Sequence, residues 1–317
     1  MAGGTKKGQG RKKKAKTTGK SETSSFGRVA LAVALVAIIA LVGGIAVVKM
    51  LPPAVATRKH ATIEKKGVEP IPPRYEVYDD HAVSTPVRRP VAPRPKKPRL
   101  ALIIDDIGYK KRVALDLLNL DPHITFAILP NSPFGKSFAA KASQKGAELM
   151  LHQPMEPMQY PKINPGPGAL LAGMDPDTLI NTLEANLRAF PSVRGMNNHM
   201  GSRLTSLSPQ MNQVMTLLKQ KGLYFIDSRT SKETVSKSSA RLLQVPFAER
   251  DIFLDHNQSR GAVARQVEKM LAMAEKHGVV IGIGHPHDVT LEVLAEMMPE
   301  IHRRVRLVRP STLVAIP

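Results

Sequence analysis

From residue 100 to the end of the chain, short apolar runs alternate with longer segments in which apolar residues recur every three or four positions. The short runs predict strands and the longer segments predict helices, so the pattern indicates β/α units around a largely parallel sheet. The expected strands cover residues 100–104, 124–129, 147–151, 193–196, 223–226, 252–254, 279–283 and 305–308, and the expected helices include 137–145, 176–189, 209–221 and 263–276.

The helix expected at 209–221 has recognisable ends. Ser208 is the predicted N-cap, Pro209 occupies the first helical position, and Gly222 follows the last one. An open doubly wound sheet would also fit this alternation. However, no Gly-rich phosphate-binding fingerprint follows the first strand, which disfavours a nucleotide-binding version of that fold.

A different pattern occupies residues 29–48, where twenty consecutive residues carry no charge and are almost all apolar. At about 1.5 Å rise per residue they match a hydrocarbon core of about 30 Å, which predicts one transmembrane helix. A buried core helix is seldom apolar on every side over this length. A signal peptide cleaved near Ala54-Val55-Ala56 is the more serious alternative, but its apolar region typically spans only about 7–15 residues. We therefore expect a retained anchor.

The chain has 317 residues, 42% apolar content and no cysteine. This length and composition are enough for one packed domain. The net charge of +20 divides into +8 over residues 1–28, +7 over 49–99 and +5 over 100–317. Because the basic charge lies mainly outside the expected domain, we expect no nucleic-acid partner. The positive-inside rule keeps residues 1–28 in the cytoplasm. In a bacterium this predicts a single-pass inner-membrane protein with a periplasmic C-terminal domain.

The segment between the expected anchor and the domain is rich in proline, with ten prolines in residues 50–99. This composition favours extended polyproline II structure and prevents a packed core. The predicted organisation is a basic cytoplasmic tail (1–28), a transmembrane helix (29–48), a Pro-rich disordered linker (49–99) and one folded domain (100–317).

Polar residues follow the expected strands of that domain. In β/α folds the carboxyl ends of the strands form the active site, so these residues are expected to converge. Taken singly, each of these residues also has a structural interpretation, since a lone histidine is usually structural and an Asp-Asp pair can cap a turn. The series is Asp105-Asp106, His152, Asn197-Asn198-His199, Asp227, Asp255-His256 and His285-Pro286-His287.

The chemistry of this set favours a divalent metal, above all Zn²⁺, because Asp, Glu and His supply its ligands in the absence of cysteine. Such an ion lowers the pKa of water and polarises a carbonyl, which amide or ester hydrolysis requires. One of Asp105 and Asp106 can then bind the metal while the other acts as the base.

Several motifs carry a family resemblance. LALIIDDIG resembles the first motif of NodB-type polysaccharide deacetylases, TFAILP their second strand, and KGAELMLHQPME the passage to their His-x-x-x-His metal motif. Together with RGMNNHMGSRLT, FIDSRTS and IGIGHPH, residues 100–316 are similar to the divergent polysaccharide deacetylase (YibQ-like) family. The resemblance implies an irregular (β/α) barrel, a divalent metal such as zinc, and hydrolysis of N- or O-acetyl groups on an acetylated envelope polysaccharide or peptidoglycan.

The resemblance assigns Asp105 as catalytic base, and Asp106 and His152 as metal ligands. Glu156 stands where a second metal histidine is expected and can still bind through its carboxylate, while His199 is the alternative source of imidazole.

His285 matches the catalytic histidine that acts as general acid, and Asp227 is expected to orient it or a metal ligand. Residues 194–199 replace the family's Arg-x-Pro-Tyr segment. Transition-state stabilisation would therefore need other donors, for which Asn198 and the amides of Gly201 and Ser202 are candidates.

Two functions follow from these expectations. The first is a metal-dependent carbohydrate deacetylase. The second is a catalytically inactive module that binds glycans or a partner protein on the same barrel, which the altered metal motif favours. Retention of both aspartates and of His285 favours the enzyme. A lectin-like role usually needs aromatic platforms, and the chain has no Trp and only 4% aromatic residues.

Overall fold

The computed structural model describes residues 97–317. The predicted cytoplasmic tail, the predicted transmembrane helix and nearly all of the predicted linker lie outside these residues. Within 97–317, no helix is both long enough and apolar enough to cross a membrane. The first strand begins at Arg99, so the folded domain starts where the proline-rich composition ends.

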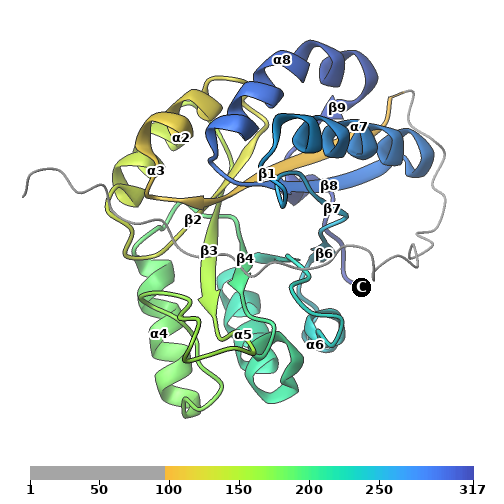
Figure 1. The fold of residues 1–317 in the computed structure, drawn as a ribbon. Coiled ribbons are helices and arrows are strands. Elements are labelled where there is room, and N and C mark those ends of the chain that lie inside the picture. Colours follow the sequence, from red (N-terminus) through yellow and green to blue (C-terminus); the bar gives the residue numbers. More distant parts are fainter. Residues whose placement is uncertain (1–96) are drawn as a thin grey trace, which may run out of the picture. The chain divides into compact units, whose positions relative to one another are not determined.

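The domain is built on a nine-stranded parallel sheet in the order β6-β5-β4-β3-β2-β1-β8-β7, with β9 also paired to β1 (Figure 1). All eight predicted strands are present, and the three-residue strand β6 is additional. The strands are β1 Arg99–Ile107, β2 Thr125–Ile128, β3 Leu149–Met155, β4 Gly195–Met200, β5 Tyr224–Asp227, β6 Phe247–Glu249, β7 Ile252–Phe253, β8 Val279–Gly284 and β9 Arg306–Leu307.

Helices cover the outer face of this sheet, with α7 beside β8 and β1, α8 beside α7 and β9, α4 beside β3 and α5 beside β5 (Figure 1). Helix α5 begins one residue earlier than its predicted cap implies, because Leu207 is the N-cap and Ser208 is already helical. It ends before Gly222, as predicted, and Gly222 adopts the left-handed conformation. The helices are α2 Lys111–Leu118, α3 Gly135–Gln144, α4 Pro176–Arg188, α5 Ser208–Lys221, α6 Ser236–Leu243, α7 Arg260–His277 and α8 Asp288–Arg304.

The sheet curls into a partial barrel whose edges are joined by one chain segment. Strand β6 pairs with β5 and strand β7 pairs with β8, and only Arg250 and Asp251 separate β6 from β7. The Arg250 amide donates to Asp227 O at 2.9 Å, and the Asp251 amide donates to Ile281 O at 2.9 Å. The segment therefore crosses from one side of the barrel to the other, although β6 and β7 form no ladder with each other in the described domain.

Side chains alternate between two cores along β1, as the pleat of a strand requires. Leu100, Leu102 and Ile104 pack against the helices, whereas Ala101 and Ile103 belong to the smaller cluster inside the barrel. Two residues near the C-terminus, Leu313 and Val314, pack against that inner cluster. Because the same alternation places Asp105 on the inner side, the strand delivers its first carboxylate to the barrel mouth.

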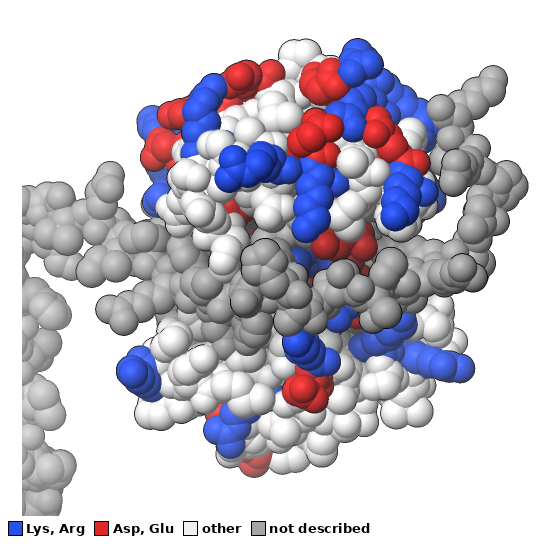
Figure 2. Space-filling view, turned by 45° about the vertical axis from the view of Figure 1, so that its right-hand side comes forward, with Lys and Arg blue, Asp and Glu red and all other residues white. Residues whose placement is uncertain are grey.

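The surface of the domain carries both signs of charge, and acidic and basic side chains are interspersed on the face shown in Figure 2. Helices α7 and α8 are joined by Arg304, whose guanidinium lies 2.6 Å from Glu268 and 2.8 Å from Glu275. These ion pairs are exposed to solvent on the glutamate side, so each contributes little to the stability of the helix pair.

Candidate active site

The site begins at an irregularity in β1. The register of β1 against β2 shifts between Ile104 and Ile107, and Asp106 has a φ of 54°, in the left-handed region. In a regular strand two consecutive side chains point to opposite faces. The bulge instead brings both carboxylates against His152, with 3.7 Å from Asp105 Oδ2 to Nδ1 and 3.1 Å from Asp106 Oδ1 to Nε2.

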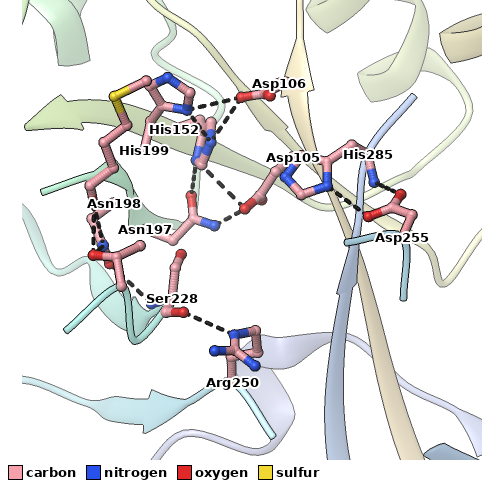
Figure 3. A network of polar contacts seen from close by, with 12 residues as sticks. Asp105, Asp106, His152, Asn197, Asn198, His199, Ser228, Arg250, Asp255 and His285 are labelled. Atoms are coloured by element: carbon pink, nitrogen blue, oxygen red, sulfur yellow. Dashed lines mark hydrogen bonds and ion pairs between the residues drawn. The ribbon is translucent and has the colours of Figure 1, made fainter. Parts of the chain in front are cut away.

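Three atoms that can bind a metal ion lie at nearly equal distances from one another (Figure 3). Asp106 Oδ1 is 3.1 Å from His152 Nε2 and 3.0 Å from His199 Nδ1, and the two nitrogens are 3.2 Å apart. Atoms that bind one ion at about 2.0–2.2 Å, in tetrahedral or octahedral geometry, lie roughly 2.8–3.6 Å from one another. Asp106, His152 and His199 can therefore hold a metal ion, as their grouping and burial indicate.

Both oxygens of Asp106 are buried and make no hydrogen bond of normal geometry, and His199 Nε2 is also without a partner among the described residues. Buried polar atoms are rarely left in this state, because the loss of hydration is then not offset. An ion bound between the carboxylate and the two imidazoles would compensate the Asp106 oxygens, so the residues present fit a divalent metal.

Asn197 connects this group to Asp105. Its side-chain oxygen lies 2.8 Å from His152 Nδ1, and its side-chain nitrogen donates to Asp105 Oδ1 at 2.7 Å. If the oxygen accepts from Nδ1–H, then His152 Nε2 carries no proton and is directed toward Asp106 and His199 with its lone pair. The sequence places Asn197 among the strand-end residues but contains no signal for this bridging role.

On the other side of β1, His285 at the end of β8 is held by Asp255. The carboxylate of Asp255 lies 2.8 Å from His285 Nδ1, and it accepts a second hydrogen bond from the His285 backbone amide at 2.6 Å. Thr290 donates to the same carboxylate at 2.7 Å. Asp255, His285 and His287 form a second close group of potential ligands.

Charge within this buried site shifts several pKa values. Burial opposes ionisation of Asp106, but His199 and His152 hold the pKa of this carboxyl well below its usual range. Burial raises the pKa of Asp105 despite His152 and His285 nearby. Burial also favours neutral His285, yet the carboxylate of Asp255 outweighs it and raises the pKa of His285 to about 9.

Glu156, expected as a metal ligand, has other partners. Its carboxylate forms an ion pair with Arg203 at 2.7 Å and accepts a hydrogen bond from the Ala172 amide at 2.6 Å. Glu156 therefore does not join the group of Asp106, His152 and His199. Its contact with the Ala172 amide instead anchors the loop between β3 and α4.

Asp227, expected to orient His285 or a ligand, accepts from the Arg229 amide at 2.7 Å and from Thr234 Oγ1 at 2.7 Å. The carboxylate that orients His285 is Asp255. Asn198, a candidate donor to the transition state, uses its side-chain nitrogen on Met200 O and Thr230 Oγ1, at 2.7 and 3.2 Å. Both of its N–H bonds are thus engaged within the protein.

A pocket joins the two halves of the site, with an open volume of about 640 Å³ that includes its solvent-filled mouth. Its polar wall includes Asp105, His152, His199 and His285. The pocket is also lined by Asn198, Met200, Ser228, Thr230, Phe253, Asp255, His256, Gln258 and His287.

The fold and the site together define an α/β partial-barrel protein with an Asp–His centre at the carboxyl ends of its parallel strands. The chain belongs to the divergent polysaccharide deacetylase family, whose family model matches residues 102–314.

The chain is also similar to two bacterial proteins and shares its fold with one solved structure. The chain is 33% identical over 219 residues to the uncharacterized protein YibQ of Escherichia coli K12, which covers 69% of this chain and 68% of YibQ. It is also 33% identical over 210 residues to an uncharacterized protein of Haemophilus influenzae, covering 66% and 74% of the two chains. The crystal structure of the uncharacterized protein ATU2773 from Agrobacterium tumefaciens has a TM-score of 0.65 at 24% identity, over 71% of this chain and 92% of that one.

Proposed function

We propose that the protein is a metal-dependent deacetylase that removes acetyl groups from an acetylated cell-envelope polysaccharide or peptidoglycan. The observation that supports this most strongly is the grouping of Asp106, His152 and His199. A further carboxylate, Asp105, lines the same pocket as the two histidines. A binding module would have no need for a second buried carboxylate next to a metal site, because a carboxylate is costly to bury.

The ion would be held by Asp106, His152 and His199, and zinc is the ion that this set of ligands favours. When bound, it supplies Lewis acidity for polarising an acyl carbonyl and activating water. Asn197 orients His152 and anchors Asp105, so the ligand and the base keep a constant separation.

Asp105 is the proposed general base. Burial raises the pKa of its carboxyl, which makes it a better proton acceptor than an exposed aspartate. The hydrogen bond from Asn197 leaves the second oxygen, Oδ2, on the side of His152. Asp105 can therefore take a proton from the attacking water while Asp106 remains ionised.

His285 is the proposed general acid. Asp255 binds its Nδ1 and raises the pKa of the imidazole to about 9, so His285 is protonated at neutral pH. Nε2 can then donate its proton to the nitrogen or oxygen of the departing sugar. The proposed base and acid follow neighbouring strands, β1 and β8, so the acyl group would lie between them.

The test is to purify the full-length chain, measure bound metal by elemental mass spectrometry, and assay acetate release from acetylated chito-oligosaccharides, xylan and peptidoglycan fragments. We expect one equivalent of metal and acetate release from at least one substrate. Asp105→Asn should retain the metal and lose acetate release by about 100-fold or more. Metal binding without acetate release from any substrate would instead support a non-catalytic glycan-binding module.

We further propose that residues 29–48 anchor the chain in the bacterial inner membrane, with the catalytic domain in the periplasm. The support is the uncharged apolar stretch and the basic segment before it. Alkaline phosphatase fused after Pro317 should be active in cells, whereas a fusion after Arg28 should be inactive. The opposite pattern would contradict this topology.

A further inference from the structure

The hydroxyl of Ser228 is a buried polar group without a partner at the wall of the pocket. The residue is 1% exposed, and its Oγ makes no hydrogen bond to any described residue. It lines the same pocket as Asp105 and His152. Because buried hydroxyl groups nearly always find a partner, the missing partner is expected to enter through the pocket.

The backbone of Ser228 is held on both sides by buried side chains (Figure 3). Its amide donates to Asn198 Oδ1 at 2.9 Å, and its carbonyl accepts from Arg250 Nε at 2.8 Å. The guanidinium of Arg250 also lies 3.8 Å from the centre of the Phe253 ring, which lines the pocket. The peptide of Ser228 is therefore fixed relative to two walls of the pocket.

The turn that follows is strained, since Arg229 has a φ of 52°. The Arg229 amide donates to Asp227 Oδ1 at 2.7 Å, which stabilises this conformation. Left-handed backbone at a non-glycine residue is unfavourable, and such residues concentrate at binding and catalytic sites. Asp227, with its buried carboxylate, thus supports the loop that presents Ser228.

Neighbouring polar groups are already engaged with one another. Thr230 donates to Met200 O at 2.9 Å and accepts from Asn198. Asn198 has no remaining donor, as described above. Ser228 is consequently the hydroxyl on this wall that a bound molecule can use as both donor and acceptor.

We propose that Ser228 is a substrate-binding residue whose hydroxyl forms a hydrogen bond with a hydroxyl group of the sugar that carries the acetyl group. The inference rests on the proposed function and names the part of the substrate that this wall recognises. A sugar hydroxyl also donates and accepts, so it complements Ser228 in either direction. Ser228 follows β5 and His285 follows β8, on opposite sides of β1 in the sheet, so the sugar would span the pocket between them.

The test compares Ser228→Ala with Ser231→Ala, which removes the same atoms from the same loop outside the pocket wall. Each is assayed on the acetylated oligosaccharide that the wild type deacetylates best and on 4-nitrophenyl acetate, which has no sugar. For Ser228→Ala, we expect the loss in kcat/KM on the sugar to exceed the loss on 4-nitrophenyl acetate by about fivefold, mainly through KM. Metal content and Tm should match those of Ser231→Ala.

Equal losses on the two substrates, or no loss on the sugar, would overturn the inference and leave the deacetylase proposal standing. If the wild type releases no acetate at all, the deacetylase proposal fails, and the subsite is tested directly by NMR titration with tri-N-acetylchitotriose and peptidoglycan fragments. Binding weakened about fivefold by Ser228→Ala alone would support the subsite. Equal binding by both variants, or none by the wild type, would overturn it.

Discussion

The side-chain amide of Asn197 donates to Asp105 Oδ1 at 2.7 Å. The oxygen of the same side chain lies 2.8 Å from His152 Nδ1, so one residue of β4 connects the proposed base on β1 to a proposed metal ligand on β3. Because amide oxygen and nitrogen have fixed roles as acceptor and donor, this bridge sets both the tautomer of His152 and the orientation of Asp105. An aspartate in its place could not do both without binding a proton.

Asn197→Ala should weaken zinc binding by about 10- to 100-fold, since His152 loses the acceptor that fixes its tautomer. Isothermal titration with zinc measures this directly, and the matched control is Asn181→Ala on the exposed face of α4. Co²⁺ substituted into the variant should also give an altered visible spectrum. Unchanged affinity and spectrum would show that Asn197 does not position His152.

Glu156→Gln should retain one equivalent of metal, whereas His199→Ala should lose most of it. The reason is that the Glu156 carboxylate binds Arg203 and the Ala172 amide, while His199 Nδ1 lies 3.0 Å from Asp106. Elemental analysis of the two variants after equal exposure to zinc separates them. Loss of metal from Glu156→Gln would mean that this carboxylate moves to the ion when it binds. The ion pair involves a half-exposed Arg203, so we expect only a small decrease in Tm.

Activity should fall as the pH rises through about 9. His285 must be protonated to act as the acid, and its raised pKa keeps the proton in place below that value. Asp255→Asn removes the charge chiefly responsible for the raised pKa of His285. The alkaline limb of the pH profile of kcat/KM should therefore shift to lower pH, toward the ordinary histidine pKa of about 6.5. Asp227→Asn is the comparison, because Asp227 bonds Thr234 and the Arg229 amide, and should leave the alkaline limb in place. If the alkaline limbs of Asp255→Asn and of the wild type coincide, His285 is excluded as the general acid.

The positions of the strands and the polar residues at their ends could be predicted from sequence because apolar runs and chain order are local properties. Which strand ends adjoin could not. Asp227 is the last residue of β5 and Asp255 follows β7. Only the sheet order, in which β7 neighbours β8, shows that Asp255 reaches His285. Strand β6 was not predicted for a different reason, since a three-residue strand is too short for periodicity to reveal.

The bulge in β1 could not be predicted from the sequence either. Regular alternation would send Asp105 and Asp106 to opposite faces, and no residue in this stretch signals left-handed backbone as a glycine would. Glu156 was expected to bind the metal but forms an ion pair with Arg203, 47 residues further along the chain. The spacing of residues within a motif does not reveal such a distant contact.

Gly195→Ala should destabilise the domain by about 1–3 kcal/mol through crowding inside the barrel. A Cβ on Gly195 would lie 2.3 Å from Tyr224 Cε2, and two more ring atoms would lie within 2.5 Å. The ring cannot easily move away, because Tyr224 is paired with Gly195 in the sheet and its hydroxyl donates to Glu148 at 2.8 Å. The buried Glu148 carboxylate also accepts from the Ser311 backbone amide at 3.1 Å, which connects this part of the barrel to the C-terminal segment.

Urea unfolding of the full-length chain, followed by near-ultraviolet circular dichroism, measures the effect. Gly173→Ala is the control, because no atom lies within 4 Å of its added Cβ and its φ is ordinary, so its free energy of unfolding should change by less than about 1 kcal/mol. Removing the ring by Tyr224→Ala should make the second change, Gly195→Ala, much less harmful than it is in the wild type. If Gly195→Ala is as costly without the ring as with it, strand propensity rather than the Tyr224 contact explains the requirement for glycine. In that case the inner wall of the barrel below the site is less tightly packed than the structure indicates.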